Sequence, residues 1–323
     1  MKNRFATSLL SALAAISATA CAPAGHVSSP TFESGQYTFS TPSQAADALQ
    51  EAVEQQDKEQ LAKIFGPAST DILSSGDDTE DRDALAAFAL AMDKGLEIRK
   101  AKNLNPALKN QQLAFLMVGK NQYPFPIALY KQANGWRFDT TVGQQEIIDR
   151  RIGKNEIRAI RSAQQYVAAQ LAYRDLQLTE GKPAQFGRKF FSAPGKHDGL
   201  YWEHREGEPL SPLGPLVAAA STEGYTVKVL NSPRPYNGYH FAILTRQGAH
   251  ARGGAMGYID SRGAMSKGFA LIAYPARYGV SGITTFLVGP DGIVYQKNLG
   301  PKTEAIARRV VAFDPDLSWV PVR

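Results

Sequence analysis

Cysteine is almost absent from this sequence, which contains a single one, Cys21, among 323 residues. One cysteine cannot form a disulfide within the chain, so no part of the fold depends on such a crosslink. Small disulfide-rich scaffolds are therefore excluded, and the chain must be stabilised by apolar cores. With 43% apolar residues, it has enough of them for two domains of ordinary size.

Long hydrophobic runs are missing after the first twenty residues. No later stretch approaches the roughly 20 consecutive apolar residues that a membrane-spanning helix requires. At the start of the chain, Lys2 and Arg4 precede a short apolar run that ends in small residues. This pattern predicts a secretory signal over residues 1–20.

Dense clusters of basic residues are missing as well. The formal charge is +6 for the chain and +4 after subtraction of Lys2 and Arg4, which leave with the signal. No run of lysine and arginine with interleaved aromatic residues is present, and export argues further against a nuclear or cytoplasmic nucleic acid. We therefore expect no nucleic-acid partner.

Motifs that mark catalytic, metal or phosphate sites are also absent. None of the five histidines is paired in the helical motif of zinc proteases, and Ser281 lacks the flanking pattern of a nucleophile elbow. The glycine pair at 253–254 is not followed by the helix start of a phosphate-binding loop. The sequence predicts no cofactor, no metal and no catalytic residue, and it favours a protein that is not an enzyme.

What the sequence does contain begins with Cys21 itself. The preceding residues 18–20, Ala-Thr-Ala, resemble the lipobox of bacterial lipoproteins, although Ala18 stands where leucine is commoner. A cysteine used once, at this position, is better explained as a lipid acceptor than as half of a missing disulfide. The alternative is a cysteine beside an ordinary cleavage site.

A lipid on Cys21 anchors a soluble body to a membrane. By the same resemblance, Ala22 after the cysteine implies transport to the outer membrane. Residues 21–36 are rich in proline, serine and threonine, which predicts a flexible tether. We expect a lipoprotein on the periplasmic side of the outer membrane, and the alternative is a soluble periplasmic protein.

Helices precede strands in the first half. Thr41 followed by Pro42 is a good helix start, Asp57 caps a second short helix, and a third begins near Asp83. Strands are predicted over 96–101, 112–118, 126–132 and 135–140. This order predicts an α+β domain over residues 37–153, with a curved antiparallel sheet. The phrases DALQEAVEQQDKEQLAKIFG and GWRFDT resemble the nuclear transport factor 2-like fold, whose sheet and helices often enclose a pocket.

A long helical pattern, residues 155–175, lies in the middle of the chain. Apolar residues recur there at steps of three and four, as an amphipathic helix requires, namely Ile157, Ile160, Ala163, Val167 and Leu171. Residues 144–152 are also compatible with a helix, but the intervening Gly153 costs about 1 kcal/mol in a helix interior. The sequence therefore predicts a hinge or domain boundary at Gly153.

Glycine and aromatic residues are frequent after the central helix. Strands are predicted over 239–246, 257–259, 268–274, 284–288 and 293–296, and residues 289–292, Gly-Pro-Asp-Gly, predict the tight turn of a hairpin. Residues 154–323 are therefore expected to form a second α+β domain, with a long helix and an antiparallel sheet.

Several segments resemble a known family. IDRRIGKNE, DGLYW, SPLGPL, NGYHFAILTRQG and GFALIAYPARYGVSGITTFLVGPDGIVYQKNLG are similar to the bacterial family catalogued as domain of unknown function 2950. The resemblance covers nearly the whole mature chain and implies an exported protein, with no activity, ligand or catalytic residue attached to the family. The second half also resembles the globular part of type IV pilins. Because its helix follows a whole domain, we do not expect filament assembly.

Candidate residues for a ligand or partner surface lie in both halves. Asp139 ends a predicted strand beside Trp136, where a carboxylate at a pocket mouth would act as a base; the alternative is a turn residue that accepts backbone N–H groups. In the second half the candidates are aromatic residues, histidines and one acid, namely His197, Asp198, Tyr201, Trp202, Tyr236, Tyr239 and His240. For the aromatic members the alternative is simple core packing.

An acidic cluster occupies residues 77–83. It lacks the glycine and the terminal glutamate of a calcium loop. We expect a solvated loop leading into a helix, whose N-terminal dipole favours acids.

These features favour a non-catalytic binding or assembly module of the cell envelope, whose partner is a peptide, a glycan or another envelope protein. The alternative is a periplasmic hydrolase with carboxylates and histidines brought together only by the fold, for example Asp198 with His197 or His204. A hydrolase requires such residues to converge in one concave site.

Overall fold

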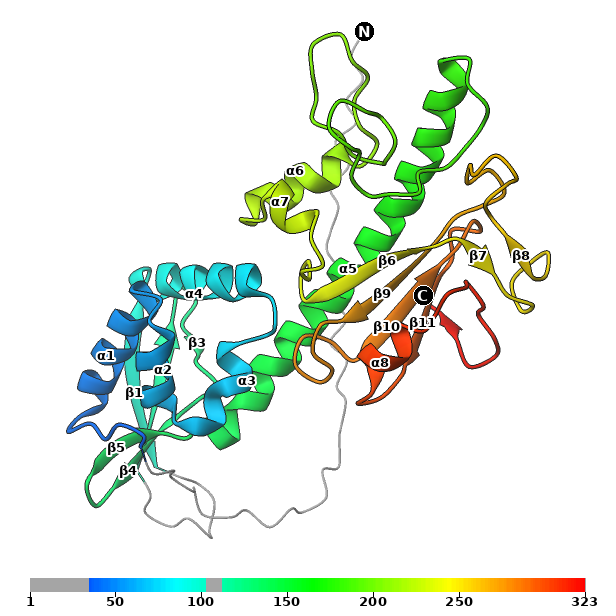
Figure 1. Ribbon diagram of the computed structural model, residues 1–323. Coiled ribbons are helices and arrows are strands. Elements are labelled where there is room, and N and C mark those ends of the chain that lie inside the picture. Colours follow the sequence, from blue (N-terminus) through cyan, green and yellow to red (C-terminus); the bar gives the residue numbers. More distant parts are fainter. Residues whose placement is uncertain (1–34, 103–111, 323) are drawn as a thin grey trace, which may run out of the picture.

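The computed structural model describes residues 35–102 and 112–322 (Figure 1). The expected signal, Cys21 and the tether up to residue 34 lie outside the described residues. Helices and antiparallel sheets build the described part, which confirms the α+β class. In this part of the chain, no helix is both long enough and apolar enough to cross a membrane.

Helices open the first half, as expected. They are α1 (Pro42–Glu54), α2 (Lys58–Phe65), α3 (Thr70–Leu73) and α4 (Asp78–Asp93), with a 3-10 turn at Pro67–Ser69. Thr41 accepts the N–H of Gln44 and caps α1, and Asp57 caps α2 in the same way. The helix expected near Asp83 begins earlier, at Asp78, because Asp77 is its N-cap.

The first sheet follows these helices. Its antiparallel strands are β1 (Leu96–Lys102), β2 (Gln112–Val118), β3 (Tyr123–Pro124), β4 (Leu129–Gln132) and β5 (Gly135–Phe138). The order is β1-β2-β4-β5, and β3 pairs with β2. Leu49 of α1, Leu61 of α2 and Phe138 of β5 belong to the core that the helices and the sheet share.

One continuous helix, α5 (Thr140–Thr179), joins the halves and passes through Gly153 without a break. The helix is therefore not interrupted at Gly153, where the sequence predicts a hinge or boundary. Gly153 is exposed and has no atom near its Cβ position, so packing on either side outweighs its low helix propensity. Ile147 packs on the first core, and Ala163 belongs to the second.

The buried face of α5 differs in part from the expected one. Ile157 and Leu171 are 53% and 38% exposed, whereas Ala159, Tyr166 and Tyr173 are buried against the second core. The apolar pattern identified the helix correctly. It placed the face correctly in part, because Ala163 is buried in the second core and Ile160 and Val167 pack against it. The two tyrosines, which the apolar pattern does not include, widen the contact with that core.

The second half builds a five-stranded antiparallel sheet on α5. Its order is β12-β11-β10-β9-β6, and α5 packs on β9, β10 and β11. The strands are β6 (Tyr239–Leu244), β9 (Ala270–Pro275), β10 (Thr284–Val288), β11 (Val294–Asn298) and β12 (Val320–Pro321). The predicted turn joins β10 to β11, and Val288 pairs with Val294.

Shorter elements surround this sheet. They are α6 (Gly214–Thr222), α7 (Val227–Leu230), α8 (Thr303–Ala307) and the pair β7 (Arg246–Gln247) with β8 (Met256–Gly257). In Figure 1, α5 runs from the helices of the first half along the second sheet and beyond it.

A carboxylate of the acidic cluster joins the two halves. The Oδ1 atom of Asp77 accepts the N–H groups of Thr79 and Glu80, at 3.1 and 3.2 Å, and so caps α4. Its Oδ2 atom accepts the hydroxyl of Tyr225 at 2.7 Å and the N–H of Gly238 at 3.1 Å. One side chain therefore caps a helix of the first half and binds the second half.

The acidic cluster divides between buried and exposed side chains. Asp77, Glu80 and Asp81 are buried, so the expectation of a solvated cluster is wrong for these three residues. Asp78 and Asp83 are exposed, as expected. The pattern of acids marks a helix start, but it contains no sign that another part of the chain covers that start.

Asn155 and Arg277 extend this junction. The Nδ2 atom of Asn155 donates to Oε2 of Glu80 at 3.0 Å and to the carbonyl of Ser281 at 3.1 Å. Arg277 forms a 2.7 Å ion pair with Asp71. These buried and half-buried contacts are directional, so they hold the halves in one orientation. The domain boundary between residues 153 and 154 stays a prediction.

Candidate ligand-binding site

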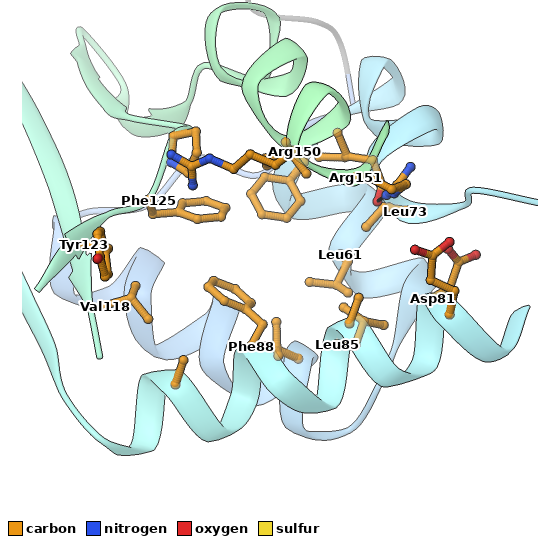
Figure 2. Close-up of a pocket in the computed structure, with 18 of the residues that line it drawn as sticks. Leu61, Leu73, Asp81, Leu85, Phe88, Val118, Tyr123, Phe125, Arg150 and Arg151 are labelled. Carbon is orange, nitrogen blue, oxygen red and sulfur yellow. Dashed lines mark hydrogen bonds between the residues drawn. The ribbon is translucent and has the colours of Figure 1, made fainter. Parts of the chain in front are cut away.

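A cavity of about 470 Å³ opens in the first half, with α2, α3 and α4 around it and α5 forming one wall (Figure 2). Its volume falls within the roughly 300–1,000 Å³ that is usual for small-molecule sites. Most of the lining is apolar, and Figure 2 shows Leu61, Leu85, Phe88, Val118 and Phe125 around one open space.

Helical periodicity brings the lining residues to the cavity. On α4, Asp81, Leu85 and Phe88 follow one another at steps of four and three, so they share one face of the helix. On α5, Ile147, Arg150, Arg151 and Lys154 line the cavity at the same kind of spacing. Each helix therefore presents one stripe to the cavity.

Part of the apolar lining is only half-buried. The rings of Phe88 and Phe125 stack with centroids 5.2 Å apart, and Phe65 lies 6.0 Å from Phe125. Phe88, Phe125, Ile72 and Leu73 are all half-buried, although they pack against the first core. A contiguous group of apolar side chains that is open to water is typical of a binding site, whereas single exposed apolar residues are common on any surface.

Positive charge lies along the α5 wall. Arg151 donates to the carbonyls of Asp71 and Ile72 at 2.7 and 2.6 Å, and burial lowers the pKa of its guanidinium. Arg150 is exposed and forms an ion pair with Glu146 at 2.6 Å. Lys154 is also exposed, and no hydrogen bond or ion pair holds its ammonium to the residues that the structure describes.

Two carboxylates close one end of the cavity, and both have partners. Asp81 accepts the N–H of Ser75 at 3.0 Å and approaches Lys58 at 3.5 Å. Glu80 accepts the Asn155 hydrogen bond described above. Burial raises the pKa of Glu80, and the hydrogen bond from Asn155 opposes that rise. The cavity therefore has a cationic wall and an acidic end whose charges are already engaged.

Asp139 does not line this cavity. It is 2% exposed at the N-terminus of α5, where its Oδ1 atom accepts the hydroxyl of Thr141 at 2.6 Å. The Oδ2 atom is buried without a hydrogen-bond partner. Its backbone N–H donates to the carbonyl of Ala128 at 2.9 Å, which fixes the chain between β5 and α5.

The loop after α5 holds a second group of candidates. His197 stacks on Trp202 with ring centroids 4.2 Å apart, and its Nε2 atom lies 3.3 Å from Glu208. Asp198 forms a 2.7 Å ion pair with Lys189, which is the main reason that its pKa is lowered. Trp202 is buried, and Tyr201 is half-buried with its ring edge on Phe191.

The last candidates lie at the start of β6. Tyr239 is fully buried in the second core, and its hydroxyl donates to the carbonyl of Thr284 at 2.9 Å. Tyr236 is half-buried and lines a smaller cavity of about 110 Å³. His240 packs beside Tyr274, and burial lowers its pKa.

These candidates do not gather in one place. The hydroxyl of Tyr173 donates to the carbonyl of His197 at 2.8 Å, which places the His197 loop beside the C-terminal half of α5. At about 1.5 Å per residue, Tyr173 lies roughly 50 Å along the helix from Asp139. No contact described above joins Asp139, His197 or His240 to another of the three. Across residues 35–102 and 112–322, no group of three or more metal-ligating side chains is present.

Sequence reasoning missed the residues of the cavity. Its clearest sequence signal is the α5 spacing of Arg150 and Lys154 beside Ile147, which places charged and apolar side chains on one stripe. Phe88 lies in the helix predicted to begin near Asp83, and Phe125 lies outside the predicted strands. A lone half-exposed phenylalanine carries no signal until the fold brings several together.

The comparisons with known proteins give one result. Neither the curated proteins nor the solved structures contain a match to this chain. The family described as Protein of unknown function (DUF2950) matches residues 36–322, which include the whole cavity and both cores. The chain therefore belongs to the DUF2950 family.

Proposed function

We propose that this protein is a non-catalytic binding module of the bacterial cell envelope, which holds a small ligand in the cavity beside α5. The observation that carries the proposal is the set of half-buried apolar side chains around a space of about 470 Å³. In a protein without a ligand, closing such a space would stabilise the fold, because removal of apolar surface from water is favourable. An apolar space that stays open is therefore expected of a binding site.

The position of the remaining candidates supports binding rather than hydrolysis. A hydrolase of the kind considered above needs a carboxylate and a histidine within hydrogen-bond reach in a concave site. His197 contacts Glu208 and Trp202 on a loop, and Asp198 is engaged by Lys189. Neither residue lines the cavity.

The location forms part of the same proposal. The signal over residues 1–20 and the single cysteine at position 21 support a lipoprotein on the periplasmic side of the outer membrane. A tethered binding module of this kind would present its cavity to small molecules of the envelope. A peptide, a glycan or another envelope protein stays the proposed partner at the half-buried Tyr201.

A neutral fluorescent probe tests the cavity. The mature chain carrying Cys21→Ser is titrated with an uncharged arylamine dye whose emission rises in apolar surroundings. The variant Ala84→Trp places a large side chain at a lining position of α4, and Ala86→Trp places it on the same helix outside the cavity. Both alanines are exposed, so both variants are expected to fold.

The proposal expects saturable binding of the dye to the parent chain and to Ala86→Trp. For Ala84→Trp it expects a loss of at least about tenfold in affinity, which corresponds to about 1.4 kcal/mol. No saturable binding to the parent chain, or equal binding to both tryptophan variants, would contradict the proposal.

A further inference from the structure

We infer that the cavity ligand is a single-chain amphiphile with an anionic headgroup, held with its chain against Phe88 and Phe125 and its headgroup at Arg150 and Lys154. This inference rests on the proposed function, because it names the ligand class of the same site. It follows from the separation of apolar and charged groups around the cavity.

The charges select the sign of the headgroup. Of the three cations on the α5 wall, Arg151 is engaged by two carbonyls, whereas the ammonium of Lys154 is exposed and forms no hydrogen bond or ion pair with the described residues. Its charge acts on Glu80 without a direct contact and lowers the pKa of that carboxyl, against the larger effect of burial. Arg150 is 62% exposed, and its pairing with Glu146 is a surface ion pair that an incoming anion readily replaces. The acids Glu80 and Asp81 accept hydrogen bonds from within the protein, so they offer little to a cationic headgroup.

The apolar part of the cavity selects the rest of the molecule. The stacked rings of Phe88 and Phe125 offer flat surfaces, and Leu85 and Leu61 continue the apolar lining toward α2. A volume of about 470 Å³ lies toward the smaller end of the roughly 300–1,000 Å³ that is usual for small-molecule sites. This size favours one alkyl chain with its headgroup over a two-chain lipid.

Displacement of the neutral dye measures this selectivity. The competitors are n-alkyl carboxylates of increasing length, n-alkanols of the same lengths, and a monoalkyl phosphate. Within the carboxylates, affinity is expected to rise about fourfold per added methylene until the cavity is full, as apolar burial requires. Carboxylates are expected to bind at least fivefold more tightly than alkanols of equal length, and this preference shrinks in 1 M salt, where the Debye length is about 3 Å.

Charge-reversal variants locate the headgroup. Lys154→Glu is expected to weaken carboxylate binding about tenfold and to leave alkanol binding unchanged. Arg161→Glu is the matched control, because Arg161 is an exposed cation of the same helix outside the cavity lining. It is expected to change neither affinity. Tighter binding of the phosphate than of the carboxylate assigns the headgroup to a phosphate-bearing lipid, and the reverse order assigns it to a fatty acid.

The failures can be told apart. If alkanols bind as tightly as carboxylates, or if Lys154→Glu and Arg161→Glu behave alike, the anionic headgroup is wrong and the binding module stands. If no alkyl compound displaces the bound dye, the amphiphile is wrong. If the dye itself does not bind, the proposed function fails first.

Discussion

The hydroxyl of Tyr225 donates a 2.7 Å hydrogen bond to Asp77, a residue 148 positions earlier in the chain. Both groups are buried. Burial and the adjacent charge of Asp77 raise the pKa of Tyr225, so the hydroxyl keeps its proton and stays a donor. Because the same carboxylate caps α4, the start of that helix and the position of the second half depend on one side chain.

Asp77→Ala is therefore expected to lower the free energy of unfolding by about 3 kcal/mol. The loss of the helix cap accounts for about 1 kcal/mol, and the loss of buried hydrogen bonds to a charged group accounts for the rest. Asp78→Ala, in the same turn but exposed, is expected to change it by about 0.5 kcal/mol. Urea unfolding followed by circular dichroism measures both, and similar values for the two variants would refute the bridging role.

Two glycines of α5 are expected to respond in opposite directions to alanine. Gly153→Ala is expected to stabilise the protein by about 1 kcal/mol, because its Cβ meets open space and the helix gains propensity. Gly143→Ala is expected to destabilise it by about 2 kcal/mol, since a Cβ there would lie 2.4 Å from the carbonyl oxygen of Pro126.

Thermal unfolding of both variants checks this pair. The two substitutions add the same atom to the same helix, so each is the control for the other. A loss of stability in Gly153→Ala would mean that the helix is interrupted there, as the sequence alone suggested.

The burial of Glu80 is expected to make the stability of the protein depend on pH. Burial raises its folded pKa above the ordinary value of 4.5, so the folded state holds the proton more tightly than the unfolded chain. This contribution to stability is present below about pH 4.5 and is lost as pH rises through the raised folded pKa. Glu80→Gln has no carboxyl to titrate and keeps an acceptor for Asn155. The free energy of unfolding of this variant should therefore decline less than that of the parent as pH rises from about 4.5 through the raised folded pKa.

The measurement is the free energy of unfolding in urea at several values between pH 4.5 and 7.5. Glu59→Gln, at a side chain 85% exposed, serves as the control and should follow the parent. An equal decline in Glu80→Gln and in the parent would show that another group causes it.

Tryptophans report on the predicted domain boundary. Trp136 is buried in the first half and Trp202 in the second. Two variants that each retain only one of these tryptophans, with Trp319 also replaced, report the unfolding of each half separately by fluorescence. If residues 37–153 and 154–323 are separate domains, Arg277→Ala, which breaks the ion pair with Asp71, should split the unfolding midpoints. Midpoints that stay coincident would indicate one cooperative unit.

Cys21→Ser tests the membrane anchor. The variant is expected to move from the membrane fraction to the soluble fraction of cells, because it lacks the thiol that the proposed lipid anchor requires. Immunoblotting of the two fractions measures the distribution. A variant that stays fully with the membrane would contradict lipid anchoring at Cys21.

Local patterns predicted most of the fold. The caps at Thr41 and Asp57 and the hairpin at residues 289–292 were correct, because their geometry depends on a few neighbouring side chains. Burial of Asp77 could not be predicted in this way, since it depends on Tyr225 and Gly238 in the other half. The cavity could not be predicted from the sequence for the same reason, because its lining comes from segments that only the fold brings together.

The length of α5 has a consequence for how this chain can change. Ile147 packs on one core and Ala163 on the other, with no loop between them to absorb a mismatch. Inserting one residue near Gly153 would rotate one contact face by about 100° relative to the other, because the helix has 3.6 residues per turn. Either the junction at Asn155 or one core would then be out of register. The continuous helix therefore fixes the rotation of one half relative to the other about the helix axis. It tolerates substitution at Gly153 far better than insertion or deletion.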